Sequence, residues 1–466
     1  MSFANKNPRS STSQQFCFAG GSVLLCVLSW LLLFPGFFTS DSLGQLAQAR
    51  QGQYSDWHPP VMAWLWRQIE HLLPGKPGML ALQLMLLWTG IFLCASAITR
   101  NLAARCVLAL ALFFFPPVFG WAGAITKDSL MLGAALVGTG LVMRLADARR
   151  RTQDTALWGA GLAFVAVCAF RHNGLFLLAG LALLAGVLRY PQCGMRRAVA
   201  TCLLLFFVPA TLGQLLNRAL IDTPSYPLAS LLSFDISGIA VAQSGDAAFS
   251  ARYQDAASVA LLRPGHQLAE LNRWHKPEDW LSLATKNPDE MQSEPPVPAV
   301  WDAQRLQALK VLWRELVQRY PADYLGHRLN VSLSLLAWGD RLVSDPACFR
   351  DRGDSAGAQI DDRNNLHKIL GWRVNWLVQE TPLLKPWLYY VLAGLLLGAA
   401  VTFRPPRWQL AAGLCVSGLL HETALFFLSP AAEYRYSAWM MVATLLASSA
   451  LICGRRAIGP RRQSID

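Results

Sequence analysis

Charged residues are scarce in this sequence. Only 15% of the 466 residues are charged, whereas 53% are hydrophobic. A soluble globular protein carries about 25% charged residues, so this chain lacks the polar surface that a water-soluble protein of its size requires. Several apolar runs reach the length of about 20 residues that crosses a hydrocarbon layer. The composition therefore predicts an all-α, polytopic membrane protein.

The sequence also lacks the common nucleotide- and metal-binding motifs. It contains no Walker, Rossmann or HExxH pattern, no CxxC pair and no zinc-ligand spacing. Nearly all ten cysteines fall inside apolar runs, where thiols behave as small hydrophobes. Only Cys348 lies in a large hydrophilic region, so we expect no disulfide pair there. We expect no cofactor, and the sequence leaves a divalent metal open.

Apolar runs divide the chain into about ten expected membrane spans. We place them near 16–38, 77–98, 103–121, 127–145, 155–170, 175–189, 199–216, 383–403, 408–429 and 437–454. The first run is longer than the apolar region of a cleaved signal peptide and ends without a small-x-small cleavage site, so we expect it to be retained.

The positive residues between these spans predict the orientation of the chain. Lys and Arg accumulate on the cytoplasmic side of a membrane, and they alternate here in a way that places both termini inside. The predicted order is a cytoplasmic tail (1–15), a membrane module (16–216) whose first outer loop is 39–76, an extracytoplasmic region (217–382), a second membrane module (383–454) and a cytoplasmic tail (455–466). We expect a bacterial inner membrane, with the functional site facing the periplasm.

The extracytoplasmic region explains the net charge of +12. It holds 20 of the 29 acidic residues but only 17 of the 41 basic ones. The positive excess therefore lies in the membrane modules and reflects orientation. No stripe of alternating aromatic and basic residues is present, so we expect membrane lipids as partners and no nucleic acid.

Three segments outside the spans have amphipathic or interfacial character. Trp301–Tyr320 has leucines at helical spacing and predicts a helix that packs on its own domain or lies on the membrane. Val331–Trp338 is apolar but too short to span, which favours an interfacial or re-entrant segment. Tyr54–Leu73 mixes Trp with charge, and Pro59–Pro60 suit the start of an interfacial helix. The extracytoplasmic region is expected to be mainly helical.

Ionisable residues recur at the helix ends of the short outer connections. The first connection contains Asp41, Asp56 and His58, the second Lys127 and Asp128, the third Arg171 and Asn173, and the last Glu433 and Arg435. The predicted topology brings these residues, far apart in the sequence, to one membrane face. An acid near a membrane is costly without a partner, which makes it a candidate functional residue.

Each of these residues also has a structural interpretation. Asp41 could cap a helix that follows it, from Ser42 to Arg50. Lys127 could reach the membrane interface or pair with Asp128, and Glu433 and Arg435 could form a structural ion pair. These interpretations do not explain why acids and cations gather together on the less positive side.

The residue types suit transfer of a group from a lipid phosphate. Cations can hold a phosphate or pyrophosphate, Arg in bidentate fashion. A nearby carboxylate can take a proton from an attacking hydroxyl group. A membrane-embedded, activated lipid donor is consistent with this chemistry and with the missing nucleotide motifs.

At this point the sequence resembles a known family. Phe34-Pro35-Gly36, Asp41-Ser42, Trp57-His58-Pro59-Pro60, Thr126-Lys127-Asp128, Arg171-His172-Asn173-Gly174 and Glu433-Tyr434-Arg435-Tyr436 together resemble the GT-C class of polytopic glycosyltransferases. The resemblance implies a polyprenyl-phosphate sugar donor, Asp41 as the catalytic base with Asp56 as a second acid, and Lys127, Arg171 and Arg435 near the donor phosphate. The acid is a lone Asp where the family pattern has an adjacent acidic pair, which weakens the case for a metal.

We therefore expect an inverting membrane glycosyltransferase, a hexosyl- or pentosyltransferase that moves a sugar to a glycan, lipid or protein of the cell envelope. His58, Asp128, Asn173 and Glu433 complete the expected substrate site. Three alternatives remain open, of which a non-catalytic scaffold is one. An O-antigen ligase or polymerase would use a pyrophosphate-linked donor. A transporter or flippase would place ionisable residues near mid-span, where only His421 and Glu422 lie.

Overall fold

The computed structural model describes residues 8–146, 150–190, 194–285, 294–349 and 365–455. All regular structure in these residues is helical, apart from isolated β-bridges, which confirms the predicted all-α class. The α-helices are α1 (Pro8–Leu33), α2 (Ser40–Gln51), α3 (Val61–Glu70), α4 (Lys76–Ile98), α5 (Leu102–Phe113), α6 (Pro116–Ala122), α7 (Lys127–Met143), α8 (Arg150–Phe170), α9 (Gly174–Arg189), α10 (Met195–Leu220), α11 (Leu228–Ala242), α12 (Ala247–Ala260), α13 (Leu271–Trp274), α14 (Ala303–Arg319), α15 (Pro321–Leu335), α16 (Asn365–Glu380), α17 (Pro386–Phe403), α18 (Trp408–Leu428) and α19 (Ala438–Arg455). The 3-10 helix η6 (Tyr434–Ser437) precedes α19.

Eight helices in the described residues are long and apolar enough to cross a membrane, and the chain is a multi-pass membrane protein. They are Ser13–Leu33, Lys76–Ile98, Lys127–Ala146, Thr152–Phe170, Met195–Leu220, Pro386–Phe403, Trp408–Leu428 and Tyr434–Cys453. The number is nine if α5 and α6, which meet at 65°, form one span.

The structure differs from the ten expected spans at two places. The run 103–121 is broken before Pro116, because proline disfavours helical backbone in the residue that precedes it. The run 175–189 forms α9, whose 16 residues extend for only about 24 Å. Both segments remain part of the helical bundle.

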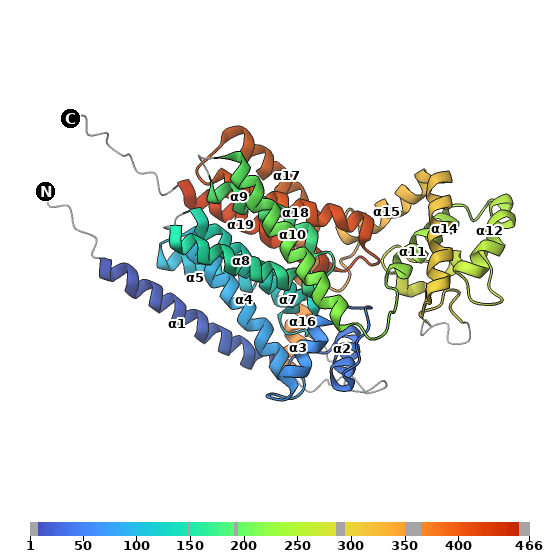
Figure 1. The fold of residues 1–466 in the computed structure, drawn as a ribbon, viewed down its shortest axis with the longest axis horizontal. Coiled ribbons are helices and arrows are strands. Elements are labelled where there is room, and N and C mark those ends of the chain that lie inside the picture. Colours follow the sequence, from blue (N-terminus) through green and yellow to red (C-terminus); the bar gives the residue numbers. More distant parts are fainter. Residues whose placement is uncertain (1–7, 147–149, 191–193, 286–293, 350–364, 456–466) are drawn as a thin grey trace.

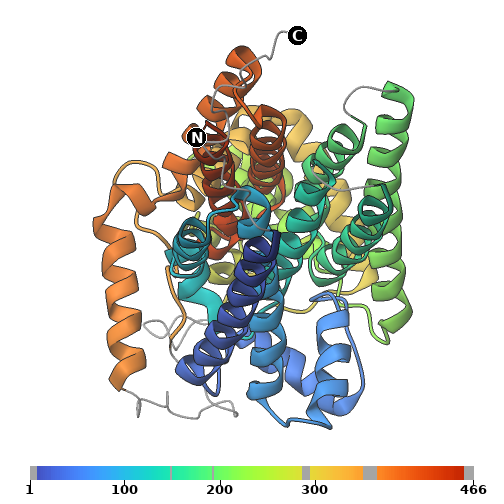
Figure 2. The same cartoon turned by 90° about the vertical axis from the view of Figure 1, so that its left-hand side faces the viewer.

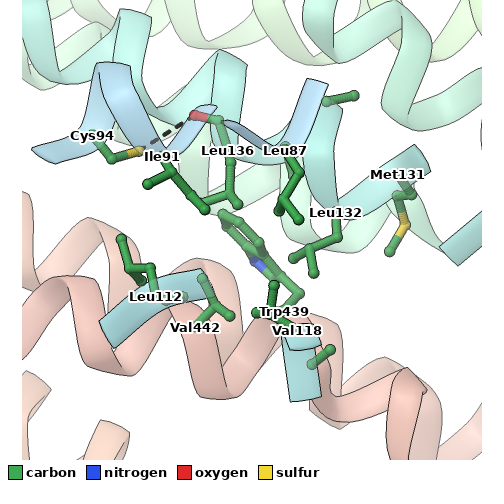
Figure 3. Close-up of a cluster of buried hydrophobic side chains, with 14 of the residues drawn as sticks. Leu87, Ile91, Cys94, Leu112, Val118, Met131, Leu132, Leu136, Trp439 and Val442 are labelled. Carbon is green, nitrogen blue, oxygen red and sulfur yellow. Dashed lines mark hydrogen bonds between the residues drawn. The ribbon is translucent and has the colours of Figure 1, made fainter. Parts of the chain in front are cut away.

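The membrane helices pack closely where glycine allows it. A Cβ atom at Gly90 of α4 would lie 2.4 Å from Cβ of Leu136 in α7, and one at Gly133 of α7 would lie 2.9 Å from Cβ of Leu86. Small residues at helix crossings permit this approach. Figure 3 shows Trp439 of α19 pointing into the apolar side chains of α4 and α7. This core fixes the start of α7 and the connection before α19.

A helical insertion lies beyond one end of the bundle (Figure 1). It comprises residues 221–285 and 294–349, and we call the end of the bundle that it covers the domain end. The insertion has a hydrophobic core of its own, into which α14 buries Leu306, Leu309, Leu312 and Leu316. The predicted helix at 301–320 is therefore confirmed, and it packs on its own domain. Val331 is fully buried in the same core, whereas Trp338 is 47% exposed, and the interfacial or re-entrant character of 331–338 stays a prediction.

A buried ion cluster joins the insertion to the bundle. Asp235 of α11 forms an ion pair with Arg328 of α15, and both side chains are at most 2% exposed. Trp313 Nε1 donates a hydrogen bond to Asp235 Oδ2 (2.8 Å). Arg328 Nη1 donates to the carbonyl oxygen of Ser429 (2.8 Å), which follows the last residue of α18. The insertion is thus attached directly ahead of the connection 430–437.

Two further helices lie at the edge of the bundle. α3 begins directly after Pro60, as the Pro59–Pro60 pair predicts. α16 is the orange ribbon at the edge of the bundle in Figure 2, and its Val374 and Val378 are buried in the core of the bundle. His367 at its start is bonded to the carbonyl oxygen of Leu32 in α1 (2.7 Å).

Candidate active site

Short backbone pairings bring the first connection to the start of α7. Phe37 N donates to Gly123 O (2.9 Å), and Ile125 N donates to Phe37 O (3.0 Å). The segment that leads into α2 is therefore fixed beside the segment that leads into α7. As a result, Asp41 lies against Lys127, 86 positions later in the chain.

Asp41 does not cap α2. The capping residue is Thr39, whose side chain accepts a hydrogen bond from Ser42 N in a reciprocal capping box. The carboxylate of Asp41 is instead in the first turn of α2, where the positive end of the helix dipole favours an acid. Its side chain is free to contact other elements, and the capping interpretation is wrong.

Both carboxylate oxygens of Asp41 face cationic or polar partners. Lys127 Nζ donates a hydrogen bond to Asp41 Oδ2 (2.8 Å), and Arg435 Nη2 lies 3.5 Å from the same oxygen. His58 Nε2 lies 3.6 Å from Asp41 Oδ1. Burial alone would raise the pKa of Asp41, but Lys127, His58 and Arg435 hold the pKa of this carboxyl far below its usual range. Without a ligand, Asp41 is an ionised partner of these groups.

His58 is held in one protonation state by Lys127. Lys127 Nζ lies 2.9 Å from His58 Nδ1, and an ammonium group can only donate, so Nδ1 must be the acceptor. The proton of the neutral ring is then on Nε2, which faces Asp41. Burial and the charge of Lys127 lower the pKa of His58 to about 3, in agreement with a neutral ring. His58 therefore orients Lys127 and Asp41 without adding charge.

A second group of ion pairs adjoins the first. Arg171, between α8 and α9, pairs with Asp128 and donates from Nε to Asn173 Oδ1 (3.0 Å). Arg435 in η6 pairs with Glu433, and its Nε lies 3.6 Å from Asp128 Oδ2. Since Arg435 contacts Asp41 as well as Asp128, it connects the two groups. The expected pairing of Lys127 with Asp128 is replaced by the pairing of Lys127 with Asp41.

We call these charged and polar side chains the charged network. It consists of Asp41, His58, Lys127, Asp128, Arg171, Asn173, Glu433 and Arg435. The described parts of four separate connections contribute to it, and all meet at the domain end. Three carboxylates and three cations are in contact, and His58 is neutral.

Aromatic rings cover the two arginines of this network. The guanidinium of Arg435 lies 4.8 Å from the ring centre of Trp121, and that of Arg171 lies 4.5 Å from the ring centre of Tyr436. Contacts of this kind hold an arginine in place. A cavity of about 20 Å³ adjoins Trp121, Asp128 and Arg435, and Arg435 Nη1 has no hydrogen-bond partner among the described residues.

The insertion places a further acid, Asp279, near the charged network. Its segment 276–281 pairs with the connection before α19: Trp280 N donates to Pro430 O (3.0 Å), and Ala432 N donates to Glu278 O (2.7 Å). Asp279 lies in this pairing. Burial raises the pKa of Asp279 to about 6, and the negative charges of Glu433, Asp345 and Asp41 add to this effect. The carboxylate of Asp279 accepts a hydrogen bond from Leu281 N (2.9 Å).

Asp56 is the one expected site residue outside the charged network. Its carboxylate accepts a hydrogen bond from Ser225 N, at the start of the insertion. Neighbouring Tyr54 is bonded in both directions to Asp222, since Tyr54 N donates to Asp222 Oδ2 (2.8 Å) and Asp222 N donates to Tyr54 O (2.8 Å). The first connection is thus anchored to the insertion at Asp56. The other two candidate residues of this connection, Asp41 and His58, face Lys127.

Glu422, deeper in the bundle, contacts a neighbouring helix. It accepts a hydrogen bond from Ser437 Oγ (2.7 Å), and its side chain is buried. This contact joins α18 to the start of α19. In the described residues, no group of three or more His, Cys, Asp and Glu side chains is arranged to hold a metal ion.

The sequence indicated neither Trp121 nor Asp279. Trp121 is six positions before Lys127, and an aromatic residue so close to a candidate cation was an available signal. Asp279 is far from every span in the sequence, and only the backbone pairing of residues 276–281 with 430–432 brings it near the site. No local pattern could have indicated it.

Comparisons with known proteins return little. No protein-family model matches the chain, and no curated protein matches it. Two solved structures align with it, both of ArnT from Cupriavidus metallidurans, one in the apo state and one bound to undecaprenyl phosphate. Sequence identity is 15% and 13%, the alignments cover 94% of this chain and 78% of the other, and the TM-scores are 0.33 and 0.34.

Proposed function

We propose that this protein is an inverting glycosyltransferase of the bacterial inner membrane, with its site facing the periplasm. It would move a sugar from a polyprenyl-phosphate donor to a hydroxyl group of an envelope glycan, lipid or protein. The observation that carries the proposal is the gathering of three cations and a partly exposed carboxylate at the domain end of the bundle. Such a group can bind a lipid phosphate and accept a proton.

In this proposal Lys127, Arg171 and Arg435 bind the donor phosphate. Their side chains are between 7% and 12% exposed, and charge interactions are stronger in such surroundings than in bulk water. Lys127 and Arg435 lie at the start of spans, at the depth where a lipid headgroup and its phosphate would reach them. As the bond between sugar and phosphate breaks, negative charge builds on the phosphate, and these cations stabilise it.

Asp41 is the proton acceptor of the proposed reaction. The acceptor hydroxyl attacks the anomeric carbon from the face opposite the phosphate, which inverts the configuration. His58, through its Nε2 proton, would keep the carboxylate of Asp41 in position. Asp128, Asn173 and Glu433 hold the two arginines. Asp56, the second acid of the proposal, keeps the first connection against the insertion, which would shape the choice of acceptor.

Transfer of a labelled sugar tests this function. Purified protein in lipid nanodiscs is incubated with envelope extract and, in separate reactions, with polyprenyl-phosphate sugars or with pyrophosphate-linked oligosaccharides, each labelled in the sugar. We expect the label to move from the lipid fraction to an acceptor, with release of polyprenyl phosphate. Transfer only from pyrophosphate-linked oligosaccharides would support the ligase alternative, and absence of transfer from every donor would contradict the proposed enzyme.

A further inference from the structure

The charged network is electrically balanced without a substrate. Its charges are those of Lys127, Arg171 and Arg435 against those of Asp41, Asp128 and Glu433. Every cation already has a carboxylate within 4 Å. A phosphate that arrives at these cations must therefore share them with a carboxylate or displace one.

Asp41 is the carboxylate that can give way. Asp128 is 6% exposed and lies between Arg171 and Arg435. Glu433 is two positions from Arg435 in the chain, and its Oε1 accepts a hydrogen bond from the Tyr436 hydroxyl (3.2 Å). Asp41 is 26% exposed and belongs to a separate helix, and no short connection ties it to its cations.

We propose that the phosphate of the lipid donor displaces Asp41 from Lys127 and Arg435, and that this displacement converts Asp41 from an ion-pair partner into the base of the reaction. The inference rests on the proposed function and concerns the control of its site. With Lys127 and Arg435 on the phosphate, the remaining neighbour of Asp41 is neutral His58, whose Nε2 lies 3.6 Å from Asp41 Oδ1, and the negative charge of Asp279 acts on Asp41 at longer range. A carboxylate in that setting holds a proton more strongly.

The reaction is balanced in charge. The acceptor O–H bond breaks and its proton goes to Asp41, while the acceptor oxygen bonds to the anomeric carbon. The bond from that carbon to the phosphate oxygen breaks, and its electron pair stays on the phosphate. One negative charge is thereby transferred from Asp41 to the phosphate, next to the cations that Asp41 has vacated.

The acceptor meets an effective base only in the complex that also contains the donor. An enzyme without donor keeps Asp41 in its ion pairs, where it accepts a proton poorly.

Binding of polyprenyl phosphate, the lipid product, tests the displacement. The equilibrium affinity of a short-chain polyprenyl phosphate is measured for the wild type, for Asp41→Asn and for Asp279→Asn. If Asp41 competes with the phosphate, Asp41→Asn binds it about tenfold more tightly, although this variant transfers sugar about 10²–10⁴-fold more slowly. Asp279→Asn removes the same charge at the same face without freeing Lys127, so we expect its affinity to stay within about twofold of the wild type.

Two other results would contradict these proposals. If Asp41 only holds Lys127 in place for the phosphate, Asp41→Asn binds polyprenyl phosphate equally or more weakly, and the inference is overturned while the proposed function stands. If the wild type fails to bind any polyprenyl phosphate, the proposed function itself fails.

A measurement on the wild type covers the case in which Asp41→Asn does not fold. Reaction of Asp41 with a water-soluble carbodiimide is followed by mass spectrometry, with Asp302, the exposed residue that caps α14, as internal reference. We expect saturating polyprenyl phosphate to increase labelling of Asp41 several-fold and to leave Asp302 unchanged. Equal labelling of Asp41 with and without the lipid would count against displacement.

Discussion

The protein contains two groups of buried acids and arginines that differ in their access to solvent. In the insertion, Asp235, Arg328 and His327 are at most 3% exposed, and Asp235 accepts a further hydrogen bond from Trp313. In the charged network, Asp41 is 26% exposed and Glu433 is 22% exposed. The first group is closed to solvent, and the second opens at the domain end.

This difference separates attachment from ligand binding. Arg328 Nη1 donates a hydrogen bond to the carbonyl oxygen of Ser429 and thereby joins the insertion to the bundle. Arg435 keeps Nη1 without a partner among the described residues, beside a cavity. Mutations in the two groups should therefore have different consequences, in stability for the first and in sugar transfer for the second.

The largest expected effect is that of Asp41→Asn on sugar transfer. Loss of the base should lower the rate of transfer by about 10²–10⁴-fold, and the protein should remain folded because Thr39, not Asp41, caps α2. The rate is measured with labelled donor, and size-exclusion chromatography in detergent checks folding. Transfer at the wild-type rate would refute the role of Asp41.

Arg328→Met should affect stability instead. It leaves Asp235 buried without its cation and removes the bond to Ser429, a change that costs about 3–5 kcal/mol. Thermal unfolding in detergent measures the loss, with Arg435→Met as the matched variant of the open group. We expect Arg328→Met to unfold at the lower temperature and to retain transfer when assayed in the cold. If Arg435→Met unfolded at the lower temperature, the proposed difference between the two groups would be contradicted.

A smaller effect is expected for Arg171→Lys. Lysine keeps the charge but cannot bind Asp128 and Asn173 together or stack on Tyr436 as the planar guanidinium does. We expect the KM for the donor to rise about tenfold with a smaller change in kcat. Steady-state kinetics at varied donor concentration measure both. An unchanged KM would remove Arg171 from the phosphate site.

The smallest effect concerns pH. The pKa of Asp279 is raised from its usual value to about 6 in the folded protein, so the folded state holds this proton more tightly than the unfolded chain. Its contribution to stability is present at low pH and is lost as pH rises through about 6. Asp279→Asn should therefore flatten the decline in unfolding temperature between about pH 4 and 7. Glu278→Gln, at the exposed neighbouring position, should leave the decline as in the wild type.

The sequence predicted what depends on local pattern. Helical class follows from the apolar runs, and burial of the leucines of α14 follows from their spacing. The ionisable residues at the ends of the short connections were expected at one membrane face, because the distribution of Lys and Arg indicates which side of the membrane each connection faces. These inferences need only periodicity and charge, which a single sequence contains.

Tertiary contacts determine the partner of each acid in and near the site. Asp41 contacts Lys127 because Phe37 pairs with residues 123–125, whereas Asp56 accepts a hydrogen bond from Ser225 N. Asp279 approaches the site only through the pairing of the insertion with residues 430–432. Backbone pairings between distant segments of irregular structure have no signature in a single sequence, so the partners of each acid could not be predicted.

The central claim, that the charged network binds a lipid phosphate, is tested most directly by the affinity of polyprenyl phosphate for Lys127→Met. Lys276→Met, which removes an exposed lysine of the insertion, is the control. The proposed function predicts that Lys127→Met loses at least about tenfold in affinity while Lys276→Met binds as the wild type does. Equal affinity of wild type and Lys127→Met would contradict it.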